Sequence, residues 1–501
     1  MKCLLLGVVC WLSVSAGAGH NLLILIADDL GLDGLPFSNA DAGASFPSVP
    51  HLESMADEGV VFTRAYTYPT CSPTRAAMLT GRHGFRTGVL SPSSSGAFSA
   101  EEHTFPEAFA YQALGYATAS FGKWHLGGDA LAPNEVGGWD HFSGSLSGGL
   151  SDFYNWTKVV NGVETELVGQ YATEVNVDDA LAWMAAQGET NWVVWMGFNA
   201  VHTPLHKPPN EMHGYDELSG TEEDITANPR AYYEAMTEAL DYQIGRLLAA
   251  VDSNETTVIF LGDNGTPSQT IQPPYDIVRR AKGSLFEGGT HVPFVMWGAD
   301  VVQGGRTVDA VVHGVDLFAT LIELGGGRVP FSGVDSRSLV PLMKNELAGW
   351  EADSVFIASD MLQGGNATGR ALRGERFAVI EINERRMFFD LELDPLESAN
   401  LLLGALSVEE QAAYDALMAG LGGMTNAAVS GFRAWIGREA TGEVLRWESE
   451  PFLSYRIQAL SALGDEGMVG VMVSNVVATV PMNEVVLDGD DRQRFFWIEV
   501  E

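Results

Sequence analysis

The sequence predicts an α/β fold in which a large, mostly parallel sheet lies between helices, with a smaller C-terminal subdomain and an appended small β module. Short apolar segments of strand length alternate with longer stretches that have the periodicity of helices. Polar residues follow each apolar segment at once. The 501 residues are enough for a large core with an appendage.

Four apolar segments have the length of buried parallel strands, at residues 21–27, 116–121, 192–198 and 257–261. Helix-like stretches separate them, at residues 49–58, 105–114, 174–186 and 231–251. Ligands of such sheets bind beyond the carboxyl ends of the strands. We therefore expect the polar residues after each strand to converge there, although they lie far apart in the sequence.

An acidic group follows the first and the last of these strands. It consists of Asp28, Asp29, Asp263 and Asn264, which are three carboxylates and an amide. Such hard oxygen donors suit Ca²⁺ or Mg²⁺ rather than zinc, and clustered carboxylates repel one another without a cation. The alternative is that each Asp caps a helix or turn. The Asp-Asn-Gly sequence at 263–265 favours the metal site.

The third cysteine, Cys71, lies in the run Cys-Ser-Pro-Thr-Arg. A solitary cysteine is usually a small buried hydrophobe, and a catalytic thiolate is a second alternative. The polar residues around Cys71 do not fit an apolar core strand. A thiolate would need a nearby His base and would not explain the acidic pairs.

Five further residues carry the charges and proton-exchanging groups that a sulfate-like oxyanion requires. Arg75, Lys123 and Lys282 are cations that can bind a delocalised negative charge. His125 and His202 are histidines, the side-chain type that ordinarily exchanges protons near neutral pH. A lone His after a strand is more often structural. The motifs around these two, Gly-Lys-Trp-His-Leu-Gly at 122–127 and Asn-Ala-Val-His-Thr-Pro at 199–204, favour a role in the site.

Several motifs in order resemble the type I sulfatases of the alkaline phosphatase superfamily, from about His20 to Leu403. They include Cys-x-Pro-x-Arg at 71–75, Leu-Thr-Gly-Arg at 79–82 and Lys-Gly-Ser-Leu-Phe-Glu-Gly-Gly at 282–289. The resemblance implies an alkaline phosphatase-like fold and hydrolysis of sulfate esters. It also implies that a formylglycine-generating enzyme oxidises Cys71 to formylglycine.

The resemblance further implies a role for each site residue. Ca²⁺, rather than Mg²⁺, would be held by Asp28, Asp29, Asp263, Asn264 and the oxygen of the modified Cys71. Arg75 and Lys123 would steady the hydrated aldehyde, and His125 would act on its hydroxyl. Lys282 and His202 would contact the sulfate ester, and His202 would protonate the leaving alcohol.

Some residues depart from the family pattern or fit it loosely. His291 stands where many relatives have arginine, and the glycine- and serine-rich segment 144–149 contains a serine that could touch the active site. We interpret His206 and Lys207 as substrate-loop or structural residues. The aromatic residues Trp139, Tyr154 and Trp156 could stack on sugars, but core or loop packing is the more common role of such side chains.

Residues 1–18 have the pattern of a signal peptide, with Lys2, an apolar run and a small-residue end. They contain Cys3 and Cys10, so the exported chain would keep one cysteine and form no internal disulfide. No later apolar run is long enough for an integral membrane segment. We expect a secreted or periplasmic protein. The formal net charge of −37 argues against nucleic acid as a partner.

The predicted sulfatase domain covers residues 19–425, with its C-terminal subdomain from about residue 320. A helix-like stretch at 407–421 lies near its end. Residues 442–501 change to short β-prone segments, at 443–447, 452–460, 468–473 and 495–500, which predict a small β-sandwich-like module. The module could attach the enzyme to polysaccharide or a cell surface, or act as a passive stabilising cap.

The predicted function is that of a sulfuric ester hydrolase on sulfated carbohydrates that also accepts aryl sulfates. One alternative is a phosphonate monoester or phosphodiester hydrolase on the same scaffold. A second alternative, from another class, is a catalytically silent carbohydrate-binding protein whose Cys71 is never oxidised.

Overall fold

The computed structural model describes the chain from residue 20 to residue 424 with short gaps, and six strands beyond it. The described ranges are 20–38, 43–275, 280–329, 334–346, 350, 354–362 and 367–424, followed by the strands between residues 434 and 500. The predicted signal peptide, residues 1–18, lies outside the described residues. None of the described helices is long and apolar enough to cross a membrane.

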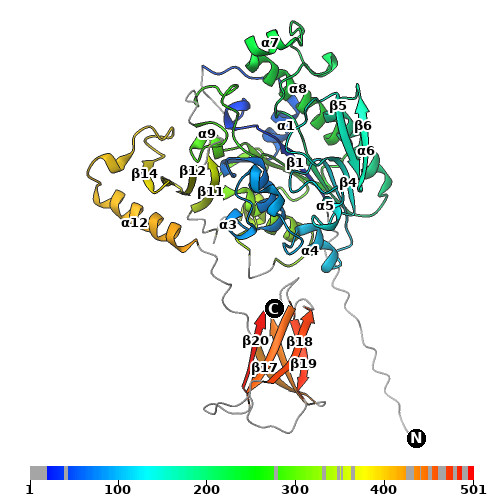
Figure 1. The fold of residues 1–501 in the computed structure, drawn as a ribbon, viewed down its shortest axis with the longest axis vertical. Helices are drawn as coiled ribbons and strands as arrows, with labels where there is room; N and C mark the ends of the chain where they lie inside the picture. Colours follow the sequence, from blue (N-terminus) through cyan, green and yellow to red (C-terminus); the bar gives the residue numbers. More distant parts are fainter. Residues whose placement is uncertain are drawn as a thin grey trace.

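A ten-stranded sheet forms the centre of the fold (Figure 1). From one edge to the other, its strands are β10 (Arg306–His313), β2 (Val60–Tyr66), β9 (Phe294–Gly298), β8 (Thr256–Gly262), β1 (Asn21–Ala27), β7 (Trp192–Gly197), β3 (Ala117–Lys123), β4 (His141–Ser145), β5 (Asn155–Val160) and β6 (Val163–Val168). The five strands from β8 to β4 are parallel, whereas β9, β5 and β6 add antiparallel pairs. The predicted mostly parallel sheet is confirmed.

Side chains alternate across β1 into two separate cores. Leu22, Ile24 and Ile26 belong to one core, whereas Leu23 and Leu25 belong to the other. The first core is shared with α2 (Cys71–Thr80), α4 (Phe105–Tyr111) and α10 (Leu317–Leu324), and the second with α1 (Pro50–Glu58), α6 (Ala172–Ala186) and α8 (Pro229–Leu248). A strand that is apolar on both faces is typical of a sheet between two helix layers.

The strand register brings two acidic sequences together. The strand β1 pairs in parallel with β8, from Asn21 opposite Thr256 to Ala27 opposite Gly262. The N–H of Asp263 continues the ladder and donates to the carbonyl of Ala27 at 2.9 Å. The residues that follow the two strands therefore emerge side by side at the same edge of the sheet.

A second, four-stranded antiparallel sheet follows in the sequence. It consists of β11 (Ser354–Leu362), β12 (Ala367–Gly374), β13 (Phe377–Ile382) and β14 (Arg385–Asp390). The helix α12 (Val408–Gly423) packs on this sheet through Leu421, beside Leu372 and Val379. This sheet with its helix fits the subdomain expected from about residue 320.

The six last strands form two three-stranded antiparallel sheets, drawn in orange and red in Figure 1. One contains β15 (Ala434–Glu439), β16 (Gly442–Glu448) and β19 (Met482–Leu487), and the other β18 (Gly470–Val477), β17 (Ser454–Leu460) and β20 (Phe495–Val500). The strands β15 and β19 were not expected from the sequence. The domain boundaries given above remain predictions.

Candidate active site

Two consecutive carboxylates end strand β1. Asp28 and Asp29 are buried, and Asp29 has a positive φ of 64°, so the chain turns sharply after the strand. Asp263 and Asn264 follow β8 and are buried as well. The N–H of Asp29 donates to Asp263 Oδ1 at 3.2 Å, and Asn264 Nδ2 donates to Asp29 Oδ1 at 2.9 Å. The structure thus brings together the four predicted acidic and amide residues.

Cys71 is the first residue of helix α2, and its side chain is buried. Pro73 fits in the first turn because N–H groups there have no partner within the helix. The helix ends at Gly81, whose φ of 66° favours glycine. The N-terminus of a helix stabilises negative charge, so an oxyanion formed at residue 71 would meet a favourable field.

His125 lies directly beside Cys71, with its Nδ1 atom 3.1 Å from the sulfur. Burial and the charge of Lys123 lower the pKa of His125 to about 2, so its imidazole is neutral. Burial raises the pKa of the Cys71 thiol, which makes it a poor thiolate at neutral pH. The nearby His that a thiolate would need is present, but the raised pKa of the thiol disfavours the catalytic-thiolate alternative.

Each carboxylate of the acidic group is paired with a different cation. Arg75 donates to Asp263 Oδ2 through Nε at 3.2 Å and through a terminal nitrogen at 2.9 Å. Lys123 Nζ lies 2.5 Å from Asp28 Oδ2. Lys282 Nζ forms an ion pair with Asp29 Oδ1. Arg75 also donates to the carbonyl of Lys123 at 2.9 Å, which ties α2 to β3.

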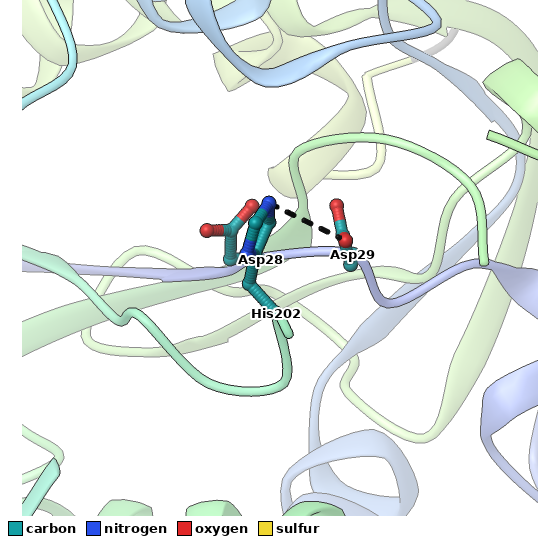
Figure 2. A group of neighbouring side chains, drawn as sticks. All are labelled: Asp28, Asp29 and His202. Atoms are coloured by element: carbon teal, nitrogen blue, oxygen red, sulfur yellow. Dashed lines mark ion pairs between the residues drawn. The ribbon is translucent and has the colours of Figure 1, made fainter. Parts of the chain in front are cut away.

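His202 enters the site from the segment after β7. Its Nε2 atom lies 3.8 Å from Asp29 Oδ2 (Figure 2). Its Nδ1 atom lies 2.7 Å from the carbonyl oxygen of Thr203. Its side chain is 21% exposed, whereas that of Asp29 is only 2% exposed. Among the predicted catalytic residues, His202 is therefore one that solvent and a ligand can reach.

The carboxylates repel one another despite their cations. Burial and the negative charge of Asp28 raise the pKa of Asp263 to about 7, although Arg75 opposes this. Burial by itself would also raise the pKa of Asp29, but the nearby charge of Lys282 holds it below its ordinary value. A divalent cation among these groups would remove the repulsion that acts on Asp263.

Two buried oxygens of the site lack hydrogen-bond partners among the described residues. They are Asp28 Oδ1 and Asn264 Oδ1. A buried acceptor without a partner costs about 1–3 kcal/mol. Ligand atoms of Asp28, Cys71 and Asp263 also lie within 4.8 Å of one another. Oxygen acceptors in this arrangement fit a hard divalent cation.

Two glycines that were not predicted as site residues lie against His125 and His202. A methyl group at Gly148 would lie 2.3 Å from Cε1 and Nε2 of His125, and one at Gly149 would lie 2.9 Å from Cε1 of His202. The glycine- and serine-rich composition of 144–149 was the available signal. A contact of one of its two serines with the active site stays a prediction: Ser147 donates to the carbonyl of Gly149 at 2.8 Å, and the buried Ser145 accepts from Asn199 Nδ2 at 3.0 Å.

The remaining residues considered from the sequence lie outside the acidic group. His291 is bonded to Glu287 at 2.8 Å and to the carbonyl of Thr63 at 2.9 Å, a structural role. Trp139 and Trp156 are buried in the two cores. His206, Lys207 and Tyr154 line a large cavity beside His202.

The sheet and its buried group of acids, cations and histidines are typical of an enzyme that acts on the ester of an oxyanion. A family model described as sulfatase matches residues 20–327, more than half of the chain. The chain belongs to the sulfatase family.

Curated relatives agree with this assignment. The chain is 28% identical to an ulvan-active sulfatase of Formosa agariphila over 394 residues, which cover 72% of this chain and 73% of the relative. It is 29% identical to bovine (Bos taurus) arylsulfatase A over 361 residues, which cover 66% and 69% of the two chains.

Solved structures share the fold. The crystal structure of Ps i-CgsB in complex with k-i-k-neocarrahexaose has a TM-score of 0.67 and 23% identity, and the match covers 81% of this chain and 92% of that chain. A second structure, in complex with its substrate D-glucosamine-2-N,6-O-disulfate, has a TM-score of 0.63 and 19% identity, and the match covers 81% and 97%.

Proposed function

We propose that this enzyme hydrolyses sulfate esters on sulfated carbohydrates after export from the cell, with a bound Ca²⁺ and a formylglycine made from Cys71. The observation that carries the proposal is the position of Cys71. It lies at a helix N-terminus, beside His125 and the carboxylates of Asp28 and Asp263. A buried thiol with a raised pKa has no evident use there, whereas a hydroxyl-bearing residue does.

The candidate ligands of the cation are oxygen atoms of Asp28, Asp29, Asp263, Asn264 and the modified residue 71. The partnerless oxygens Asp28 Oδ1 and Asn264 Oδ1 support this set. When bound, such a cation lowers the pKa of a coordinated hydroxyl and polarises the sulfate group. Hard oxygen donors favour Ca²⁺, since its coordination tolerates several carboxylates at once.

The conversion of Cys71 is a two-electron oxidation carried out by a formylglycine-generating enzyme. Sulfur leaves as sulfide, oxygen takes its place, and that enzyme supplies the oxidant. The hydrated aldehyde supplies one hydroxyl to attack sulfur and a second whose deprotonation releases sulfate. A serine in its place would keep the sulfate as a stable alkyl ester.

The surrounding side chains hold charge and move protons. Arg75 binds the carboxylate of Asp263, and Lys123 binds that of Asp28, so both cations fix carboxylates that lie near Cys71. His125, neutral and 3.1 Å from residue 71, can accept the proton of its second hydroxyl. His202 and Lys282 both lie beside Asp29, and the partly exposed His202 can protonate the leaving alcohol.

Carbohydrate sulfates are the substrate class that the relatives favour. The Formosa agariphila relative is an ulvan-active sulfatase, and two of the solved structures hold a neocarrahexaose and a glucosamine disulfate. The large cavity beside His202 gives this chain space for a sugar.

Steady-state turnover of 4-nitrophenyl sulfate tests the proposed reaction against its rival on the same scaffold. The matched comparison is a 4-nitrophenyl phosphodiester, under the same conditions and with CaCl₂. We expect kcat/KM for the sulfate to exceed that for the phosphodiester by at least about 100-fold, which corresponds to about 2.7 kcal/mol of transition-state discrimination. A preference for the phosphodiester would refute the sulfatase reaction.

A further inference from the structure

A cavity of about 1270 Å³ opens beside His202. Three segments and Gln269 line it, and the segments are residues 151–154 before β5, residues 203–210 after His202, and residues 219–229 around the helix α7 (Glu222–Ala227). Thr203, whose carbonyl oxygen contacts the imidazole of His202, is part of its wall. The cavity exceeds the range of about 300–1,000 Å³ that is typical of small-ligand sites. It can therefore accept more than the reacting group.

The wall of this cavity is rich in neutral hydrogen-bonding groups. Hydroxyl and amide side chains line it beside a similar number of apolar residues; the hydroxyl and amide residues are Ser151, Thr203, Asn210, Ser219, Thr226 and Gln269. Hydroxyls and amides both donate and accept hydrogen bonds. A wall of mixed hydroxyl, amide and apolar groups suits a ligand that has both hydroxyls and apolar faces, as a sugar does.

A rigid aromatic surface borders the same cavity. The ring of His206 stacks on that of Phe153, with 4.1 Å between centroids and 28° between planes. Its Nδ1 atom lies 3.0 Å from the carbonyl oxygen of Pro204, and its Nε2 atom lies 3.2 Å from the hydroxyl of Tyr171. Burial lowers the pKa of His206 to about 4, so the ring is neutral. A fixed, neutral, half-buried ring can pack against the apolar face of a sugar at little entropic cost.

The charges around the cavity limit what it can hold. Among its described lining residues, Lys207 is the only lysine or arginine, whereas Asp152 and Glu222 are acidic. Asp152 accepts bonds from the N–H of Tyr154 at 2.7 Å and from Asn155 at 2.9 Å, which fix it in place. Two carboxylates would repel a densely sulfated segment, but one ammonium group can bind one anionic group.

We propose that this cavity is a subsite for the sugar residue next to the one that carries the scissile sulfate, and that Lys207 holds at most one anionic group on that neighbour. The inference rests on the proposed function and deepens it, because it makes the substrate a sparsely charged glycan chain rather than a monosaccharide. His206 provides the ring against which the neighbouring sugar packs.

Titration calorimetry with size-fractionated glycans tests this subsite. The protein carries Cys71→Ala, which removes turnover, and the probes are mono-, di- and tetrasaccharides from carrageenan, ulvan and heparin. We expect the carrageenan or ulvan series to bind at least about tenfold more tightly from mono- to disaccharide, about 1.4 kcal/mol. The densely sulfated heparin series should show no such gain. Lys207→Gln and His206→Ala should each remove most of the gain, whereas Lys344→Gln, an exposed lysine away from the cavity lining, should keep it.

Three outcomes would overturn the subsite: no gain with length in any series, a gain with heparin alone, or a gain that both cavity variants retain. The proposed function is tested separately by turnover of 4-nitrophenyl sulfate with unmodified protein. A length-dependent gain without that turnover would leave the glycan subsite standing and refute the sulfatase reaction. Turnover of 4-nitrophenyl sulfate without a length-dependent gain in affinity would support the sulfatase reaction and refute the glycan subsite.

Discussion

Lys123 and Asp28 form a fully buried ion pair that uses only one of the two carboxylate oxygens. Lys123 Nζ lies 2.5 Å from Asp28 Oδ2, and both side chains are 0% exposed. Asp28 Oδ1, equally buried, has no partner among the described residues. Since buried acceptors are almost always satisfied, the free oxygen points to a cation at this position.

Calcium should therefore stabilise the folded protein through Asp28. Ca²⁺ at about 100 times its Kd should add about 2.7 kcal/mol to the free energy of unfolding, and EDTA should remove that gain. Differential scanning calorimetry of Asp28→Asn should show a much smaller calcium effect. The control Asp309→Asn, which changes an exposed ion pair, should respond like the unmodified protein. An unchanged Tm on adding Ca²⁺ would contradict the metal site.

Gly148 should tolerate no side chain, because a methyl group there would lie 2.3 Å from the His125 imidazole. Gly148→Ala should displace His125 and lower kcat for 4-nitrophenyl sulfate by about 100-fold, the scale of a 1 Å misplacement of a catalytic group. Gly128→Ala is the matched control, since no atom lies within 4 Å of its added methyl. Equal activity of the two variants would show that Gly148 does not set the position of His125.

Arg373 should be a large contributor to stability. This fully buried residue of β12 is 2.7 Å from both Glu287 and Glu397, and it donates to the carbonyl of Leu285. Arg373→Met should remove the cation between two buried carboxylates and cost about 3–5 kcal/mol of unfolding free energy. Arg376→Met, which removes three partly exposed ion pairs, should cost much less than Arg373→Met. Urea denaturation of both variants measures the difference, and similar losses would refute it.

The stability of the fold should fall below neutral pH because of His83. Burial lowers the pKa of His83 to about 3, so in the folded protein it stays neutral, with its Nδ1 atom 2.7 Å from the Tyr68 hydroxyl. The unfolded chain binds a proton near pH 6.5 and is favoured as the pH falls towards 3. Between pH 7 and pH 5 this linkage should remove about 2 kcal/mol. His83→Gln should lose correspondingly less over that interval in urea titrations; an unchanged difference between the two pH values would count against the linkage.

The sequence predicted the strands of the central sheet best where a continuous apolar run ends in polar residues. The strand predicted at 21–27 matches β1, and those at 116–121, 192–198 and 257–261 match β3, β7 and β8 within two residues at either end. Continuous apolar runs bounded by polar residues define such strands well. The strands β5 and β6 at one end of the sheet were among those not predicted, and the edge strand β6 is largely exposed and lacks an apolar run.

The predicted site residues lie together because the carboxyl ends of parallel strands lie at the same edge of a sheet. The sequence shows this directly for those residues that follow a predicted strand. The pairing of each cation with its own carboxylate was not predictable, since it depends on side-chain reach across the site. The contacts of Gly148 and Gly149 with the two histidines, and the cavity around Lys207, depend on loop conformation. A sequence pattern says little about loop conformation.

Mass spectrometry of the tryptic peptide that contains residue 71 tests the central claim most directly. Protein purified from its native host, or produced with a formylglycine-generating enzyme, should yield a peptide about 18 Da lighter than the cysteine form, the change from thiol to aldehyde. Its abundance should rise in proportion to kcat for 4-nitrophenyl sulfate across preparations. Full turnover by protein whose Cys71 peptide carries an unmodified thiol would contradict the account.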